Sequence, residues 1–361
     1  MYRQSPELDI GVDIKLPDKI KQFIIEMPKV ELHLHLEGAI PLETLLHLIQ
    51  RRGNEPSINT LDDLRRKLIY TDSTHFGEVW TWKNTFITEE KDFEEIAYQV
   101  LRGLHQQNAR YVEAFYSPGD YWRQGLSAQG ITEYLIKGKE RASHDFGIKS
   151  ELIVDLIRND GPRIGMQRLE ELTPYLGKGL IGIGLGGSER EFPADPYTDV
   201  YKEAKERGFR LTAHAGETAG ADSVWAAVEK LHVERIGHAT RANEDQKLIS
   251  LLQEKQIPLE MCVISNVKRR VCKSMKDHPI KGYLEQGLMV TVNSDDPTMF
   301  NTSITQEYLA LVQELDFSLS DLKRLVMNSI EASFMSDSDK ELMKSQFERE
   351  WKQLLNKYTV K

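Results

Sequence analysis

The segment around which this chain is organised is KVELHLHLEG, residues 29–38. Its apolar and polar side chains alternate with period two, which is the pattern of a β-strand with two different faces. The leucines form one face, and His33 and His35 lie on the other, in phase with Glu31 and Glu37. Two imidazoles on one face of a strand can bind a single metal ion. A His-x-His pair by itself is more often exposed or merely hydrogen-bonded, so its meaning depends on the segments that follow.

Seven later segments also have strand character, and stretches with helical spacing separate them. The strands are predicted over 110–118, 149–157, 180–187, 210–217, 234–240, 257–265 and 288–296. Helices are predicted over 20–26, 41–53, 76–86, 93–104, 130–146, 166–175, 196–208, 221–231, 244–255 and 280–286, with more at the C-terminus. Alternating strands and helices indicate a parallel sheet, and eight such units with no strand left over predict a (β/α)8 TIM barrel.

The domain organisation predicted from this pattern is a single barrel that takes up the whole chain of 361 residues. Barrels of this type often reach such a length as one domain. Residues 1–18 are expected to be an N-terminal extension, and residues 54–104 a helical insertion after the first strand. Within the insertion, Trp80, Trp82 and Phe86 either pack in the core or overhang a pocket, and their spacing favours the core.

Composition narrows the class of protein. Hydrophobic residues make up 40% of the chain, charged residues 29%, and the formal net charge is −9, which together indicate a soluble globular protein without a basic stripe for nucleic acid. The densest basic run, Lys268-Arg269-Arg270, is predicted to be a solvated loop. No apolar stretch approaches the roughly 18 residues of a membrane span. Cys262 and Cys272 are too few for a disulfide framework, and the N-terminus does not resemble a signal peptide, so a cytoplasmic location is expected.

Polar residues that could carry chemistry fall at the carboxyl ends of the predicted strands, where barrels place their functional groups. Four of the ten histidines do so, namely His33, His35, His214 and His238, and Asp295 ends the last strand. Three histidines and one carboxylate suit a divalent ion and favour Zn²⁺, with a position left for water. Such an ion would lower the pKa of that water toward neutrality and supply a hydroxide nucleophile.

Hydrolysis at such a site also needs groups that move protons. Glu217, three residues after His214, can reach the reacting centre without binding the metal. His238 can orient the water or deprotonate it. Asp295 and Asp296 are adjacent and must point in different directions, so one can bind metal while the other reaches substrate.

Four separated motifs, ELHLHLEGA, HAGE, RIGHAT and VNSDDP, resemble the adenosine deaminase family of the metal-dependent amidohydrolases. The resemblance runs from residue 29 to about residue 334. It implies one Zn²⁺ held by His33, His35, His214 and Asp295, with His35 also beside the substrate.

The resemblance further implies how the remaining groups act on a purine. Glu217 would protonate the ring nitrogen beside the attacked carbon, and His238 would handle the proton of the water. Asp296 and the Gly187 backbone would hydrogen-bond the purine, and Glu37 would face the sugar. The reaction implied is hydrolytic deamination of adenosine or 2′-deoxyadenosine to (deoxy)inosine and ammonia.

Some residues resemble other members of the family. Glu37 and Phe115 are similar to adenine deaminases, which convert adenine to hypoxanthine, whereas Gly237 and Ser117 are similar to the adenosine enzymes. The alternatives are therefore an adenine deaminase or a deaminase of a 5′-modified adenosine such as aminodeoxyfutalosine. Another metal-dependent hydrolase on the same barrel and a non-catalytic binding barrel are more distant possibilities. The expected partner is a small purine nucleoside, and the sequence carries no signal for an oligomeric state.

Overall fold

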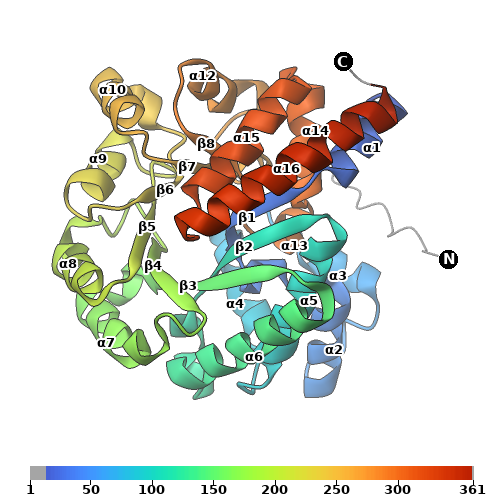
Figure 1. Cartoon of the computed structure of the whole chain (residues 1–361). Coiled ribbons are helices and arrows are strands. Elements are labelled where there is room, and N and C mark those ends of the chain that lie inside the picture. The colour runs from blue at the N-terminus through green and yellow to red at the C-terminus, as the bar shows by residue number, and fades with distance from the viewer. Residues whose placement is uncertain (1–13, 360–361) are drawn as a thin grey trace.

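The computed structural model describes residues 14–359, and eight parallel strands form the centre of it (Figure 1). The part of the predicted N-terminal extension over residues 1–13 lies outside the described residues. The strands pair in chain order from β1 to β8, which confirms the (β/α)8 barrel. Their bounds are β1 Lys29–His35, β2 Ala109–Tyr116, β3 Lys149–Ile157, β4 Leu180–Gly186, β5 Arg210–Ala215, β6 Arg235–His238, β7 Leu259–Met261 and β8 Val290–Val292.

Helices surround the strands, as Figure 1 shows for α7 to α10 along one side of the barrel. The segment between β1 and β2 holds α2 to α5, and four helices follow β8. The bounds are α1 Asp18–Glu26, α2 Leu42–Arg52, α3 Leu61–Lys67, α4 Ser73–Asn84, α5 Asp92–Gln106, α6 Ala128–Phe146, α7 Pro162–Leu172, α8 Thr198–Arg207, α9 Ala221–Glu229, α10 Gln246–Lys255, α11 Val263–Lys268, α12 Ile280–Glu285, α13 Pro297–Phe300, α14 Ile304–Leu315, α15 Leu319–Ala332 and α16 Asp337–Tyr358.

One predicted strand is partly wrong. The apolar run over residues 257–265 was expected to be extended throughout, but β7 ends at Met261 and α11 begins at Val263. A short apolar run is compatible with either a buried strand or a buried helix, because periodicity cannot separate the two. The helical turn redirects the chain at the rim of the barrel, which changes where the residues after it lie.

The barrel closes between its first and last strands through the residues that carry the sequence motifs. Leu34 and Asp295 form a parallel bridge. The Asp295 N–H donates to the His33 carbonyl at 2.9 Å, and the His35 N–H donates to the Asp295 carbonyl at 2.9 Å. Closure of the fold therefore holds the backbone of Asp295 between those of two histidines of β1.

A buried ionic network fills the interior of the barrel. Arg235, on β6, is completely buried and donates to Glu113 of β2 at 2.5 Å and to Glu260 of β7 at 2.6 Å. It also donates to the carbonyl of Ala332, and the Phe334 N–H donates to Glu113. The connection between α15 and α16 is thus tied to three strands by charged groups that water does not reach.

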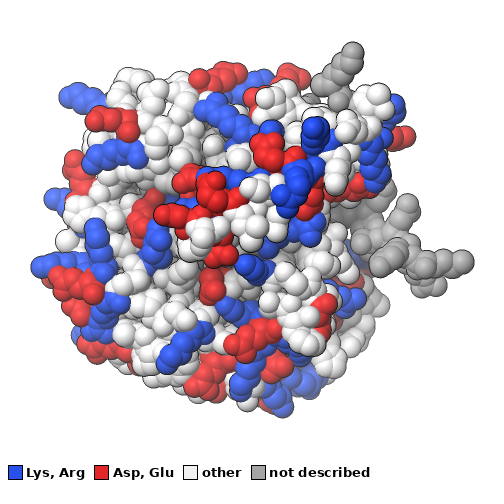
Figure 2. Space-filling model, viewed as in Figure 1, with Lys and Arg blue, Asp and Glu red and all other residues white. Residues whose placement is uncertain are grey.

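The surface carries charges of both signs. On the face shown in Figure 2, lysine and arginine side chains are interspersed with aspartate and glutamate side chains. Among the described residues, no helix combines the length and the apolar character needed to cross a membrane. Cys262 and Cys272 are both buried free thiols.

Candidate active site and metal centre

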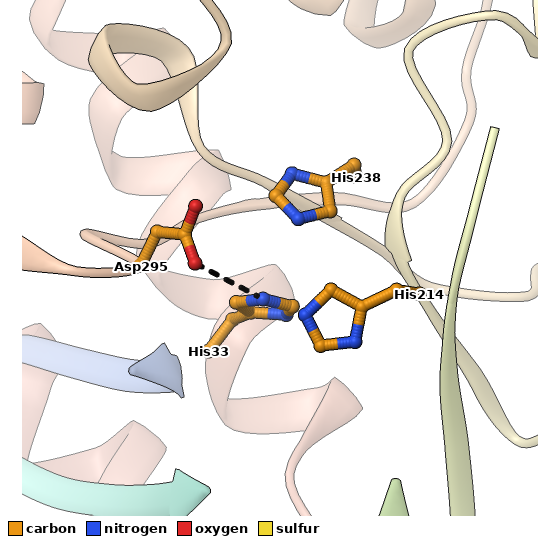
Figure 3. Close-up of side chains that lie close together, drawn as sticks. All are labelled: His33, His214, His238 and Asp295. Carbon is orange, nitrogen blue, oxygen red and sulfur yellow. Dashed lines mark ion pairs between the residues drawn. The ribbon is translucent and has the colours of Figure 1, made fainter. Parts of the chain in front are cut away.

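Side chains from four strand ends meet at the carboxyl-terminal mouth of the barrel (Figure 3). His33 comes from β1, His214 from β5, His238 from β6, and Asp295 from the turn after β8. One potential ligand atom of each lies within 4.8 Å of those of the others. Register explains part of this proximity, since His214 of β5 pairs directly with Gly237 of β6.

His35 joins the same centre from the end of β1. Its Nε2 lies 3.1 Å from Nε2 of His214 and 3.5 Å from Oδ1 of Asp295, and Nε2 of His33 lies 3.6 Å from that oxygen. His35 also forms a second potential ligand group with Asp295 and Asp296. The structure therefore brings together all four residues expected to bind metal, with His238 beside them.

The protonation of these groups fits a divalent cation. Burial lowers the pKa of His35 to about 3 and that of His214 well below its ordinary value, so both are neutral, as metal ligands must be. Burial opposes ionisation of Asp295, but His33 and the other imidazoles hold its pKa well below its usual range. Nε2 of His33 is buried without a hydrogen-bond partner in the described structure. Neutral imidazoles, an ionised carboxylate and an unpartnered nitrogen form a donor set that suits zinc.

Backbone conformation at the mouth is unusual. His238, Ala239 and Asp295 have φ angles of 63°, 52° and 62°, in the left-handed region that side chains other than glycine rarely adopt. Such residues cluster at functional sites, where the surrounding structure enforces the conformation. Gly237 has a steric role, because a Cβ atom there would lie 2.8 Å from Cε1 of His33.

Carboxylate and hydroxyl groups behind the centre orient its side chains. Glu260 accepts a hydrogen bond from Nδ1 of His33 at 2.7 Å, which turns Nε2 toward the other histidines. The hydroxyl of Ser265 donates to Oδ2 of Asp295 at 2.5 Å, which leaves Oδ1 facing the imidazoles. Burial alone would lower the pKa of His33, yet the carboxylate of Asp295, with its Oδ1 3.6 Å from Nε2, and the hydrogen bond with Glu260 raise it to about 10. A cation bound at Nε2 would take the place of that proton.

Glu217 lies at the mouth, in a turn whose backbone is bound by the carboxylate of Glu189. Its Oε1 lies 3.9 Å from Nε2 of His238. Glu189, which follows β4, accepts hydrogen bonds from the backbone N–H groups of four consecutive residues, 216–219, at 2.5 to 3.1 Å. Burial raises the pKa of Glu189, but hydrogen bonds from Ser223 and from these backbone groups outweigh burial and lower it. Glu189 therefore fixes the turn that positions Glu217.

The prediction that the basic run Lys268-Arg269-Arg270 is a solvated loop is in part wrong. Nη1 of Arg269 lies 2.5 Å from Oε1 of Glu217, and Arg269 also lies over the ring of Phe76. Its side chain is only 21% exposed. The helix α11 ends just before Arg269 and turns this side chain into the mouth, which an extended strand would not have done.

A cavity of about 930 Å³ opens onto these groups. Asp296 and Gly187, both expected to bind the purine, line it, together with Asp155. Burial and the charge of Asp295 raise the pKa of Asp296 well above its usual range, so Asp296 carries a proton that it can donate. Gly38 makes room for Asp296, because a Cβ atom at position 38 would lie 1.9 Å from its Oδ1.

Glu37 is buried beside the cavity in the short helical turn after β1. Its Oε1 accepts the Ser117 N–H at 2.8 Å, and burial raises the pKa of its carboxyl to about 7. Ser117 lines the cavity, whereas Glu37 is not among the described residues that do so. Trp80 of α4 also lines the cavity and donates to Asp120 at 2.7 Å. Trp80 and Trp82 are partly buried and pack against the core, and Phe86 is fully buried, as predicted; Trp80 in addition lines the cavity.

Several residues of the site were not singled out from the sequence. Asp155 and Glu260 are charged residues inside the apolar runs 152–157 and 257–265, a signal that would have marked both. Glu189 lies in the glycine-rich stretch LGGSE. Lys83, buried and 3.9 Å from the centre of the Trp80 ring, has no such signal, because a lysine in the last turn of a helix is ordinarily exposed.

Comparison with known proteins agrees with this geometry. The model of the family described as adenosine deaminase matches residues 28–349. An adenine deaminase of Wolinella succinogenes is 33% identical over 321 residues, which cover 89% of this chain and 97% of the relative. An adenosine deaminase of Clostridium perfringens is 31% identical over 327 residues, covering 89% and 98%.

Solved structures show the same likeness. The crystal structure of an adenine deaminase from Arthrobacter aurescens has a TM-score of 0.85 and 31% identity, and the match covers 90% of this chain and 98% of that one. An amidohydrolase from Burkholderia ambifaria with bound zinc has a TM-score of 0.88 and 25% identity, with 97% of each chain covered.

Proposed function

The chain belongs to the adenosine deaminase family, and from this premise we propose that its substrate is the free base adenine. As a member of the family it is a hydrolase that acts on a C–N bond of a purine ring. The observation that carries the choice of substrate is that relatives between 31% and 35% identical over nearly their whole length are named adenine deaminase. Glu37 and Phe115 support the choice, because both resemble the residues of adenine deaminases at these positions.

The reaction replaces the 6-amino group by oxygen. Oxygen of water forms a bond to C6, and the bond between C6 and the amino nitrogen breaks. One proton of the water ends on the adjacent ring nitrogen and the other leaves with ammonia, so that adenine and water give hypoxanthine and ammonia. The site must therefore bind the ring, hold the water and transfer a proton.

His33, His35, His214 and Asp295 are proposed to hold one Zn²⁺. When bound, the ion supplies Lewis acidity, which lowers the pKa of water at its open position toward neutrality. Glu260 keeps the proton of His33 on Nδ1, so that Nε2 is the nitrogen available to the ion.

Glu217 is proposed to deliver the proton to the ring nitrogen. It lines the cavity, and its Oε1 lies 3.9 Å from Nε2 of His238, close enough for both groups to act on one bound substrate. Arg269 and the turn held by Glu189 restrict its movement. Protonated Asp296 and the backbone of Gly187 are proposed to recognise the purine edge, since both line the same cavity.

Adenosine is the second candidate. A cavity of about 930 Å³ is near the upper end of the range for small-molecule sites, and it extends to Trp80 and Arg241, which leaves room for a sugar beyond the base. The relative from Clostridium perfringens named adenosine deaminase favours the same substrate.

Parallel assays of ammonia release and purine absorbance test these assignments. Purified full-length chain is given adenine, adenosine, 2′-deoxyadenosine and 5′-substituted adenosines, including aminodeoxyfutalosine, under identical conditions. We expect the highest kcat/KM with adenine. Turnover confined to nucleosides would overturn the assignment of the free base, and no ammonia from any of these compounds would overturn deamination itself.

A further inference from the structure

A row of buried polar groups ends at Nδ1 of His238, the ring nitrogen that does not face Glu217. Nδ2 of Asn266, on α11, lies 3.1 Å from this nitrogen. Nε2 of His278 lies 3.0 Å from Oδ1 of the same asparagine. The backbone N–H of Ile280, at the start of α12, then lies 3.3 Å from Nδ1 of His278. All three side chains are buried, with His238 and Asn266 completely so.

The direction of every hydrogen bond in this row follows from the backbone N–H of Ile280. A backbone N–H can only donate, so Nδ1 of His278 accepts from Ile280. Burial lowers the pKa of His278 to about 3, and the ring is therefore neutral with its single proton on Nε2. That proton is donated to Oδ1 of Asn266, so the amide group of Asn266 must direct its N–H toward His238. Nδ1 of His238 accepts it, and the proton of neutral His238 is assigned to Nε2 by this network.

The backbone N–H of Ile280 also disfavours the opposite arrangement, in which His238 carries its proton on Nδ1. If His238 carried its proton on Nδ1, the amide of Asn266 would have to turn its oxygen toward His238 and its NH₂ toward His278. Nε2 of His278 would then have to accept, and its proton would move to Nδ1, where it would face the N–H of Ile280 at 3.3 Å. Two donors would meet in a buried place without an acceptor.

We propose that Asn266 and His278 are positioning residues that fix His238 as a hydrogen-bond donor at Nε2. Among the described residues Nε2 has no hydrogen-bond partner, and at 3.9 Å it is too far from Oε1 of Glu217 to bond to it. The N–H is therefore available to a water molecule or substrate that binds beside the two side chains.

This assignment decides between the two roles that the sequence allowed for His238. A neutral imidazole with its proton on Nε2 can neither bind a metal nor accept a proton at that nitrogen. His238 lies beside the other residues drawn in Figure 3 but differs from them chemically, because they have free atoms that can act as metal ligands. It holds the oxygen of the reacting water by donating to it, so it does not take the proton of that water.

The first test reads the tautomer directly and does not depend on the proposed function. The full-length chain is labelled with ¹⁵N in its histidine rings and loaded with Zn²⁺, and the two nitrogens of His238 are distinguished by NMR, because protonated and bare ring nitrogens have separate shifts. We expect a protonated Nε2 and a bare Nδ1. A wild-type spectrum with the proton on Nδ1 overturns the inference, whatever the enzyme does.

The second test uses Asn266→Asp, which keeps the shape of the side chain but can only accept. Both His278 and His238 must then donate to the carboxylate, so the proton of His238 is expected to move to Nδ1. We expect kcat with adenine to fall roughly 100-fold, the usual effect of losing one donor at a reacting oxygen, with little change in KM. A folded, Zn²⁺-loaded Asn266→Asp chain with the wild-type tautomer or the wild-type kcat contradicts the proposal.

Two further variants keep the outcome decisive. His278→Phe removes the donor to Oδ1 of Asn266 and is expected to give a mixture of His238 tautomers. This variant tests the proposal if Asn266→Asp does not fold. Ser329→Ala, which loses a buried hydrogen bond on α15 outside the row, is expected to keep the wild-type tautomer and kcat. The kinetic arm rests on the proposed function: a protonated Nε2 in a chain that does not turn over adenine contradicts that function and leaves the tautomer assignment in place.

Discussion

Replacement of Glu260 by glutamine should weaken metal binding although Glu260 is not a proposed ligand. The two oxygens of Glu260 accept from Nδ1 of His33 at 2.7 Å and from Nε of Arg235 at 2.6 Å. A glutamine has only one acceptor for these two donors. If its oxygen stays on Arg235, its NH₂ faces His33, and the proton of His33 has to move to Nε2, the nitrogen proposed to bind the ion.

The expected decrease in zinc affinity follows from this loss of the correct His33 tautomer. Groups that orient a metal-binding histidine typically change metal affinity by about 10- to 100-fold, which is about 1.4 to 2.7 kcal/mol. We expect Glu260→Gln to lie near the upper end, because both orientations of the amide create a conflict. The same change weakens a fully buried ion pair with Arg235, so a lower Tm is expected as well.

Competition with a chromophoric zinc chelator measures the affinity, at a temperature where circular dichroism shows both proteins folded. Glu350→Gln serves as the matched control, since it removes an exposed carboxylate paired with Arg110 and should leave zinc affinity unchanged. If folded Glu260→Gln binds zinc as tightly as the wild type, the role given to Glu260 in orienting His33 is refuted.

Three other outcomes are expected. Glu217→Gln should lower kcat by about 10²- to 10⁴-fold with zinc content unchanged, as checked by steady-state kinetics and elemental analysis. Near-normal turnover would remove Glu217 as the proton donor. Glu37→Asp, which withdraws the carboxylate held by Ser117, should raise the ratio of kcat/KM for adenosine to that for adenine by roughly 10-fold, and an unchanged ratio would show that Glu37 does not set the choice. Burial raises the pKa of Glu307 to about 8, so the folded state keeps a proton that the unfolded chain has lost, and the free energy of unfolding should fall as pH rises from about 4.5 to about 8, by at most about 1.4 kcal/mol per pH unit for this group. Glu307→Gln should flatten that dependence in thermal melts across this range, and an identical slope would contradict the assignment.

The sequence by itself was sufficient for the architecture and for the place of the candidate site. Eight strand-like segments separated by helices leave little choice other than a parallel barrel, and parallel strands put their carboxyl ends at one mouth. Residues at those ends, such as His33, His214 and Asp295, had to come close together wherever the exact strand limits lay. This inference is robust because it depends only on periodicity and chain direction, both of which are local properties.

Only the tertiary structure decided which groups orient these side chains. Glu260 reaches His33 across 227 positions of sequence, and Glu189 holds the backbone around Glu217 from another strand end. Arg269 lies in the mouth because α11 replaces the expected end of a strand. Hydrogen bonds of this kind depend on side-chain direction in turns and on contacts between distant elements, and neither is encoded by a repeating pattern. The tautomer of a histidine depends on them in turn, because a proton is placed by its neighbours in space and not by its neighbours in the chain.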